Sequence, residues 1–401
     1  MEFRIANAAD TPAVEDLWAY CFEHKDDPFF KYYFGSYYEP EHTMVGYDKD
    51  QLVSTVHLRQ YQLNVRGKAM PVSYMVGVAT DPIARRGGIG GQLLQASLEE
   101  LHKRGQALTI LMPSKAVFYQ QYGWDLYAHQ WVEHVDLDAL RGVTDRTLHF
   151  GRISKVEDWT LLAPVYEAYT KGLSGYAIRS EEDWKRLLGS VLAEGADIAY
   201  VKNEAGTIEG YCFYKLGEPT IAVSEMVYTS RKGQQGLLNY LYNHRSQGEA
   251  VEWNEGMQDS GYVFYPNGKA GHRTMPFMMS RLVDMVDAFQ MVPSEYRREA
   301  TLTIATADPL VEANTGIFRL HFIGDGQVAV EKISDAEPNA AQLKRGIVDV
   351  YATIGSLSLL LMGRLTADEL VFEGKMQATD KALAVLHEAY PKQKTYINEW
   401  W

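Results

Sequence analysis

The hydrophobic pattern of the first part of the chain distinguishes strands from helices. Segments such as residues 52–65 belong to stretches rich in β-branched and aromatic residues, which is typical of strands. Apolar residues recur at every third or fourth position in residues 10–22 and 93–101, which indicates helices packed on one side. In chain order the pattern predicts a strand, a helix, three strands, a helix, a strand and a short helix that Ser114 caps and Gly123 ends. This order is of α/β type.

Two further blocks follow the first, and we expect domain boundaries near residues 1–149, 150–290 and 291–401. The second block repeats the first in a weaker form, because "SRKGQQGLL" again places a basic residue and glycines at a predicted helix start but with altered glycine spacing. It also carries a predicted helix over residues 157–172. The third block changes character, with predicted strands followed by an apolar helical segment over residues 340–355.

Composition and charge narrow the range of functions. The chain has 401 residues and a formal net charge of -13, which argues against nucleic-acid binding and is compatible with cationic substrates, although a solvated acidic surface is the commoner explanation. The two cysteines, Cys21 and Cys212, form no disulfide framework, which predicts a cytoplasmic setting. Without an HExxH motif or a cluster of histidine and cysteine, we expect no metal. The N-terminus lacks a signal-peptide pattern, and the longest apolar cluster, residues 357–362, is too short to span a bilayer.

Residues 78–94, "VATDPIARRGGIGGQLL", concentrate glycines at the start of a predicted helix. Amide groups at a helix N-terminus and the helix dipole attract phosphate, and glycines let it approach the backbone. Arg85 and Arg86 would add positive charge. The Walker pattern would need a lysine where Gln92 stands, and the dinucleotide pattern would need a glycine where Leu93 stands. A glycine-rich turn with two surface arginines is the alternative interpretation.

The same segment resembles the acetyl-CoA motif of the GCN5-related N-acetyltransferases (GNAT). The family signature, Gln/Arg-x-x-Gly-x-Gly/Ala, is met by Arg85, Gly88 and Gly90 directly after a predicted strand. The resemblance implies that the loop holds the pyrophosphate of coenzyme A and that the preceding strand binds pantetheine through its main chain. The cofactor-binding residues that it implies are Val78, Ala79, Thr80, Arg85, Arg86, Gly87, Gly88, Ile89, Gly90, Gly91, Ser114 and Lys115.

A second element of the family follows the next strand. The segment "PSKAVFYQQYGW" is similar to the family's Phe-Tyr-x-x-x-Gly-Phe pattern, with Trp124 in place of the usual phenylalanine. The resemblance puts Tyr119 where the family often carries a tyrosine near the coenzyme sulfur. Because a thiolate leaves when an amine attacks a thioester, a tyrosine there can act as a general acid. The alternative is that Tyr119 only packs on a short amphipathic helix.

Over nearly its full length the chain resembles one branch of the family, the enhanced intracellular survival (Eis) group. The resemblance implies two GNAT folds in tandem, the second degenerate, a sterol-carrier-protein-like C-terminal domain and assembly into homo-oligomers, as hexamers. It also implies an unusual general base, the α-carboxylate of the last residue, Trp401. Apolar surroundings would raise the pKa of an α-carboxyl group, ordinarily about 3.3–3.7, and two terminal tryptophans make a buried chain end plausible. Simple packing of the tail is the alternative, with Glu399 or a carboxylate between Glu23 and Glu41 as the base.

An aromatic and acidic segment, residues 21–41, is the candidate for acceptor binding. Aromatic walls with carboxylates suit a polycationic amine through cation–π and ionic contacts. We expect Asp26, Phe29, Tyr33 and Glu399 to bind the acceptor, which the resemblance indicates to be an aminoglycoside, a polyamine or a lysine amine. A mobile loop with a local aromatic core is the alternative structure of this segment.

The leading interpretation is an acetyl-CoA-dependent N-acetyltransferase. One alternative is a carrier of hydrophobic ligands with an active last domain and a vestigial first one, and another is a scaffold that binds coenzyme A without chemistry. The intact motif residues Arg85, Gly88, Gly90 and Tyr119 argue against a vestigial first domain.

Overall fold

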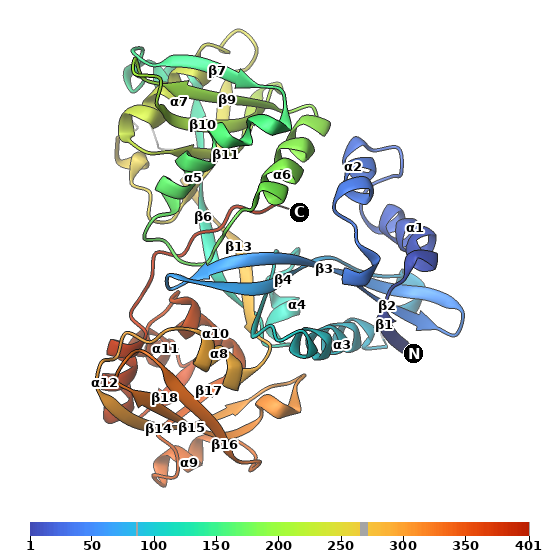
Figure 1. Cartoon of the computed structure of the whole chain (residues 1–401), viewed down its shortest axis with the longest axis vertical. Coiled ribbons are helices and arrows are strands. Elements are labelled where there is room, and N and C mark those ends of the chain that lie inside the picture. The colour runs from blue at the N-terminus through green and yellow to red at the C-terminus, as the bar shows by residue number, and fades with distance from the viewer. Residues whose placement is uncertain (86, 265–271, 401) are drawn as a thin grey trace.

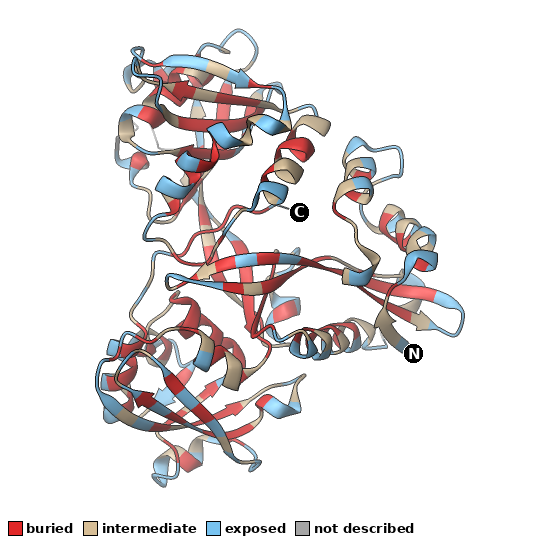
Figure 2. Ribbon diagram, in the orientation of Figure 1, coloured by how far each residue is buried: buried red, intermediate tan, exposed pale blue. Residues whose placement is uncertain are grey.

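The structure is a computed structural model and describes residues 1–85, 87–264 and 272–400. Figure 1 shows three lobes, with the C-terminal segment running from the third lobe to the junction of the other two. Buried residues follow the strands of each lobe, and Figure 2 shows them continuing across the junctions between lobes.

The helices, 3-10 helices (η) and strands alternate along the chain. The first lobe contains β1 (Glu2–Ile5), η1 (Ala8–Asp10), α1 (Thr11–Cys21), α2 (Pro28–Ser36), η2 (Pro40–His42), β2 (Thr43–Asp48), β3 (Gln51–Val65), β4 (Lys68–Thr80), η3 (Pro82–Ala84), α3 (Ile89–Lys103), β5 (Leu108–Leu111), α4 (Ala116–Gln120) and β6 (Asp125–Asp136). Next come η4 (Leu137–Gly142), β7 (His149–Ile153), η5 (Val156–Leu161), α5 (Ala163–Thr170), β8 (Tyr176–Ala177), α6 (Glu181–Ala193), β9 (Asp197–Lys202), β10 (Ile208–Lys215), β11 (Thr220–Tyr228), α7 (Arg231–Tyr242), β12 (Ala250–Gly256), η6 (Gly261–Phe264), β13 (His272–Leu282) and α8 (Met285–Met291). The last lobe contains β14 (Glu299–Ala307), η7 (Glu312–Asn314), β15 (Gly316–Ile323), β16 (Val328–Ser334), α9 (Ala340–Lys344), β17 (Val350–Thr353), α10 (Ile354–Met362), α11 (Ala367–Phe372), β18 (Met376–Ala378) and α12 (Asp380–Ala389).

The strands of the first two lobes form one sheet. Its order is β1-β2-β3-β4-β5-β13-β6-β12-β11-β10-β9-β7, with β8 paired to β3. Strand β13, from late in the chain, lies between β5 and β6 and pairs antiparallel with both. Strand β6 pairs in turn with β12. The two lobes are therefore joined by main-chain hydrogen bonds, and a ligand at their junction meets residues that are far apart in sequence.

The predicted elements of the first lobe are present within a few residues of their expected bounds, but the predicted N-cap of the short helix α4 is wrong. Helix α4 begins after Lys115, whose side chain makes no cap hydrogen bond, so Ser114 does not cap it. Strands β6, β12 and β13 are not predicted by the pattern. Buried polar residues such as Gln130, Glu133 and Glu255 interrupt the apolar alternation in two of these strands.

Two predicted helices are also wrong in part. Residues 340–355 do not form one helix, because Gly346, with φ of +68°, turns the chain and the following β-branched and aromatic residues form β17. Strand β17 then pairs in parallel with β14. The predicted helix over residues 157–172 is divided into η5 and α5, since Pro164 stands at the start of α5.

The third lobe packs its most apolar helix against the shared sheet. Every residue of α10 is buried, and the helix contacts β13 and β6. The hydroxyl groups of Ser280 and Ser358 lie 2.8 Å apart across this contact. Among the residues that the structure describes, none of the helices has the length and apolarity that crossing a membrane requires.

A buried ion pair joins the third lobe to the first two. The guanidinium of Arg281 on β13 pairs with Asp308, and both side chains are fully buried. Arg281 Nε also donates to the Tyr122 carbonyl oxygen at 2.8 Å, just after α4. Its guanidinium carbon lies 5.0 Å from the ring centre of Trp124. Burial lowers the pKa of Arg281 while Asp308 opposes the change, so this carboxylate stabilises the buried charge.

We predict that Asp308→Ala lowers the free energy of unfolding of the full chain by about 3–5 kcal/mol, because it leaves a buried guanidinium without its partner. Asp335→Ala is the matched control, since Asp335 is 90% exposed and pairs with Lys332 at the surface, where ion pairs contribute little. Urea unfolding followed by intrinsic fluorescence measures both variants. Similar losses in the two would contradict this account of the junction.

Candidate active site

The glycine-rich loop leaves the start of α3 open. Gly88 is the N-cap residue, with φ of 74° and no side chain to satisfy the amides of the first helical turn. A Cβ atom on Gly88 would meet nothing within 4 Å, whereas one on Gly91 would come within 2.9 Å of the Tyr122 hydroxyl. The loop thus presents backbone amides to a ligand at Gly88 and packs tightly against the α4 region at Gly91.

Strand β4 separates from β5 just before this loop. The two strands pair in parallel over Val72–Met75 and Leu108–Leu111, and no later pair is recorded between them within the described residues. On its other side β4 stays paired with β3, with a shift of register near the point of separation. Main-chain groups after Met75 therefore face a gap, where an extended ligand can add to the strand.

A cavity of about 540 Å³ lies between the gap, the loop and α4. It is lined by Val78, Thr80, Arg85, Gly88, Ile89, Gly90, Ser114, Lys115, Phe118, Tyr119 and Tyr122. All of these except Phe118 and Tyr122 are residues that the sequence predicts for the cofactor or for catalysis. The predicted residues Ala79, Gly87 and Gly91 are not part of this lining, and Arg86 lies outside the described residues.

Tyr119 lies on the wall of this cavity. Its side chain is mostly buried on α4, with 7% of the residue exposed, and packs edge-on against Phe118 and Trp124. Burial raises the pKa of Tyr119 to about 12, so its hydroxyl keeps its proton throughout the neutral range. Because Arg281 holds the carbonyl of Tyr122, the position of α4 depends on the buried pair with the third lobe.

A second cavity, of about 510 Å³, lies where the first two lobes meet. It is lined by Glu23, Asp27, Phe29, Tyr37, Tyr61, Asp183, Leu187, Ser190, Val191, Glu194, Ala196, Phe213, Ser224, Glu225, Asn398, Glu399 and Trp400. Six of these side chains are carboxylates, five are aromatic, and none of the described lining residues is a lysine or an arginine. Such a cavity favours a cation with several charged groups.

The structure places only part of the predicted acceptor site in this cavity. Phe29 and Glu399 line it, but Asp26 and Tyr33 do not. The Asp26 side chain is fully exposed beside Lys31, and Tyr33 is fully buried, where it stacks on Trp18. The segment around the start of α2 thus contributes Asp27 and Phe29 to the cavity rather than Asp26, because Asp27 caps α2 and turns the chain there.

Three of the six carboxylates come from elements that the sequence does not connect to the segment before α2. Asp183 and Glu194 belong to the α6 region, and Glu225 lies on β11. Only Glu225 carries a signal that sequence reasoning could have used, because a carboxylate in the middle of an apolar strand such as β11 requires a partner when it is buried. Glu194 directly follows the last residue of α6, and partial burial raises the pKa of its carboxyl group.

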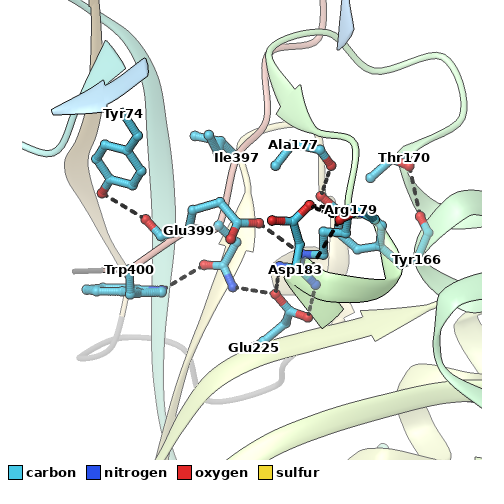
Figure 3. Close-up of polar contacts among 12 residues, drawn as sticks. Tyr74, Tyr166, Thr170, Ala177, Arg179, Asp183, Glu225, Ile397, Glu399 and Trp400 are labelled. Carbon is cyan, nitrogen blue, oxygen red and sulfur yellow. Dashed lines mark hydrogen bonds and ion pairs between the residues drawn. The ribbon is translucent and has the colours of Figure 1, made fainter. Parts of the chain in front are cut away.

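The C-terminal segment forms the third wall of this cavity. Residues 395–399 are buried, and Figure 3 shows the last of them pointing into the junction. The Tyr74 hydroxyl on β4 donates to the Glu399 carbonyl oxygen at 3.1 Å. Trp400 is 40% exposed and packs on Phe277, so the tail is anchored by residues before the terminal tryptophans. Trp401 lies outside the described residues.

Arg179 gathers two carboxylates at the centre of the junction (Figure 3). It donates to both Glu225 oxygens, at 2.8 and 2.6 Å, and to Glu399 at 2.9 Å. Its own side chain is 1% exposed and lies over the rings of Tyr166 and Trp184. Burial alone would raise the pKa of Glu225, but the charge and hydrogen bonds of Arg179 lower it. The pKa of Glu399 is raised, chiefly by burial, although Arg179 opposes this.

The corresponding helix start in the second lobe is closed. Ser230 is the N-cap residue of α7, and its hydroxyl oxygen accepts from the Gly233 amide at 3.0 Å. Gly233 packs so closely on the Glu209 carbonyl that a Cβ atom could not fit. The Ser230 hydroxyl therefore already occupies the Gly233 amide, whereas Gly88 leaves the corresponding helix start without a side-chain cap.

One possible metal-ligand group is present away from both cavities. His102, Asp284 and Asp287 place one ligand atom each within 4.8 Å of one another, between the end of α3 and the start of α8. Exposed histidine and carboxylate groups commonly lie together without an ion, and the cavity linings do not include these residues.

Comparison with known families divides the chain in the same order as the lobes. The sequence model of an acetyltransferase (GNAT) domain matches residues 2–127, and a second acetyltransferase (GNAT) model matches residues 175–282. A sterol carrier protein domain model matches residues 285–398. A curated relative, an uncharacterized N-acetyltransferase of Streptomyces avermitilis, is 25% identical over 148 residues, which is 35% of this chain and 36% of that protein.

Solved structures show the same fold over the whole chain. A probable N-acyltransferase from Enterococcus faecalis has a TM-score of 0.85 at 20% identity, covering 100% of this chain and 99% of the other. A GCN5-related N-acetyltransferase from Anabaena variabilis has a TM-score of 0.82 at 18% identity, with both chains covered fully. Eis1 from Mycobacterium abscessus has a TM-score of 0.75 at 16% identity, again with full coverage of both. The chain, with two acetyltransferase domains in tandem and a sterol carrier protein domain in an Eis-like arrangement, belongs to the GNAT acetyltransferases and is an acyltransferase.

Proposed function

We propose that this acyltransferase moves the acetyl group of acetyl-CoA to a primary amine of a polycationic acceptor, such as a polyamine, an aminoglycoside or a lysine side chain. The observation that carries the proposal is the cavity at the junction, whose described lining has six carboxylates and no basic residue, so that four carboxylates remain besides the two that pair with Arg179. We name the cavity at the junction the acidic cavity, and the cavity lined by Gly88 and Tyr119 the coenzyme cavity. Strand β4 connects the two, because Tyr74 contacts the tail beside the acidic cavity and Val78 lines the coenzyme cavity.

The proposed reaction is a direct attack. The amine nitrogen attacks the thioester carbonyl carbon, the carbon–sulfur bond breaks, and coenzyme A leaves as a thiolate. Tyr119 gives its proton to that thiolate, a role that suits a hydroxyl still protonated at neutral pH. The proton that the amine loses passes to a general base.

The base in this proposal is the α-carboxylate of Trp401. Its support is the course of the preceding residues, which are buried in the acidic cavity beside β4. The Glu399 side chain is the weaker candidate, because its carboxylate already accepts a hydrogen bond from Arg179. On the resemblance to the Eis group alone, we add that the enzyme is a cytoplasmic homo-oligomer, a hexamer.

The direct test is the release of free thiol from acetyl-CoA in the presence of a panel of amines. We expect spermidine and aminoglycosides to stimulate release strongly, and their KM to rise with ionic strength because salt screens the carboxylates. Glutamate, an amine with net negative charge, serves as the matched acceptor that the cavity should reject. Equal turnover of glutamate and spermidine, or no stimulation by any amine, would contradict the proposal.

Gly88→Val should weaken binding of coenzyme A at least about tenfold, or ~1.4 kcal/mol, because a branched side chain would stand where the pyrophosphate approaches the loop. Gly105→Val is the control, since Gly105 also has a positive φ and open surroundings but lies beyond the other end of α3. The two substitutions impose similar backbone strain, and calorimetric titration distinguishes them. Unchanged affinity in folded Gly88→Val would remove the phosphate role from the loop.

Tyr119→Phe should lower kcat by about 10²–10⁴-fold, the usual contribution of a general acid, while acetyl-CoA still binds. Tyr20→Phe, which alters an exposed tyrosine on α1, should leave kcat unchanged. Steady-state kinetics together with a direct binding measurement separates the two effects. If the Tyr119→Phe enzyme turns over at nearly the parent rate, the tyrosine only packs in the cavity wall.

A further inference from the structure

The two acetyltransferase domains pair their central strands in the same way up to one point. In the first domain β4 pairs in parallel with β5 up to Met75, and in the second β11 pairs in parallel with β12 up to Val223. The outer partners, β3 and β10, both carry a register shift beside the end of this pairing. The residues after Val223 therefore correspond to the part of β4 that lines the coenzyme cavity.

In the second domain this position is occupied by the chain's own C-terminal segment. The Asn398 side chain donates to the Ser224 carbonyl oxygen at 3.0 Å and to Glu225 at 3.1 Å, just after the end of the β11–β12 pairing. From the other side, Gln130 on β6 donates to the Asn398 side-chain oxygen at 2.8 Å. The asparagine thus satisfies a strand carbonyl that the separation of β11 from β12 leaves available.

Earlier tail residues are bound by the second domain as well. The Tyr396 amide donates to the Ser174 carbonyl oxygen at 2.9 Å, and the Ser174 amide donates to the Lys394 carbonyl oxygen at 3.0 Å. The Tyr396 ring is 5% exposed and packs in the same apolar cluster as Tyr166 and Trp184. The segment therefore adds to the second domain like an extended peptide, with main-chain bonds for affinity and one aromatic anchor.

Charge makes this binding depend on Arg179. Glu225 is fixed by the Tyr211 hydroxyl at 2.6 Å as well as by Arg179, so it stays in place if the arginine is lost. The guanidinium would then no longer separate Glu225 from Glu399, and two buried carboxylates would face each other. Because like charges at short range in a buried site repel strongly, the mobile partner, which is the tail, would leave.

We infer that the second acetyltransferase domain acts as a receptor for the C-terminal segment, and that Arg179 is the positioning residue that holds Glu399, and with it the last described residues of the tail, at the junction of the two domains. The domain uses the place where the first domain receives its coenzyme to hold a peptide instead. The consequence for turnover rests on the proposed function, whereas the consequence for the position of the tail does not.

The experiment is carboxypeptidase trimming of the full-length protein, followed by intact mass. We expect Arg179→Ala to lose its C-terminal residues at least about tenfold faster than the parent, because the tail spends more time released. Arg298→Ala is the matched control, since Arg298 pairs with Glu388 through both carboxylate oxygens but at the surface of the third lobe. It should be trimmed at the parent rate.

Two further measurements separate positioning from general loss of structure. Millimolar guanidinium chloride should restore protection and turnover to Arg179→Ala by filling the vacated site, whereas ammonium chloride should not. Asn398→Ala leaves the sequence of the second domain and its Arg179–Glu225 pair intact, and it should also be trimmed faster. In both variants kcat should fall while the KM for acetyl-CoA stays unchanged, because the coenzyme cavity does not include these residues.

The inference would be overturned if the tail of a folded Arg179→Ala protein were as protected as in the parent. It would also be overturned if Arg298→Ala were trimmed as fast as Arg179→Ala. Fast trimming together with full turnover of the untrimmed variant would support the second domain as the tail receptor while showing that the base lies elsewhere. Fast trimming with lost turnover supports both the receptor role and the proposed function.

Discussion

The structure depends most on the need to neutralise one buried charge. The Arg179 guanidinium is almost completely removed from water, and its charge is balanced by carboxylates from two distant parts of the chain, Glu225 on β11 and Glu399 in the tail. Removing one partner of such a buried pair commonly costs several kcal/mol, so the arrangement strongly favours the tail in its bound position. The acidic cavity exists because this tail, α6 and the loop before α2 meet at the same place.

The three domains contribute to the candidate site in different ways. The first domain keeps an open helix start at Gly88 and a gap beside β4, whereas the second caps its corresponding helix with Ser230 and fills the corresponding strand position with Asn398. The third domain reaches the coenzyme cavity indirectly, because Asp308 holds Arg281, and Arg281 holds the carbonyl of Tyr122 beside α4. In this account one domain performs the chemistry and the other two determine where Tyr119 and the chain end lie.

The sequence could predict features that depend on local spacing. The loop around Gly88, the end of β4 and the segment around Tyr119 are each recognisable from a short motif, and residues of all three line one cavity. The acceptor side could not be predicted in the same way, because Asp183, Glu194 and Glu225 join it only through strand exchange between the lobes. Aromatic and acidic composition also could not distinguish Asp27, which lines the cavity, from Asp26, which faces solvent. Residues 350–353 form a strand for a similar reason, since pairing with β14 is a tertiary contact.

The central claim is that the first domain becomes an enzyme only when the chain end is held in its active site. The most direct measurement supplies the tail separately, as a synthetic peptide of residues 394–401, KTYINEWW, to protein that ends at residue 393. The account predicts that the shortened protein binds acetyl-CoA but does not acetylate spermidine, and that the peptide restores turnover in a saturable manner. A peptide with a C-terminal amide should bind without restoring activity, because it lacks the terminal carboxylate. Full activity of the shortened protein alone, or equal rescue by the amidated peptide, would contradict the account.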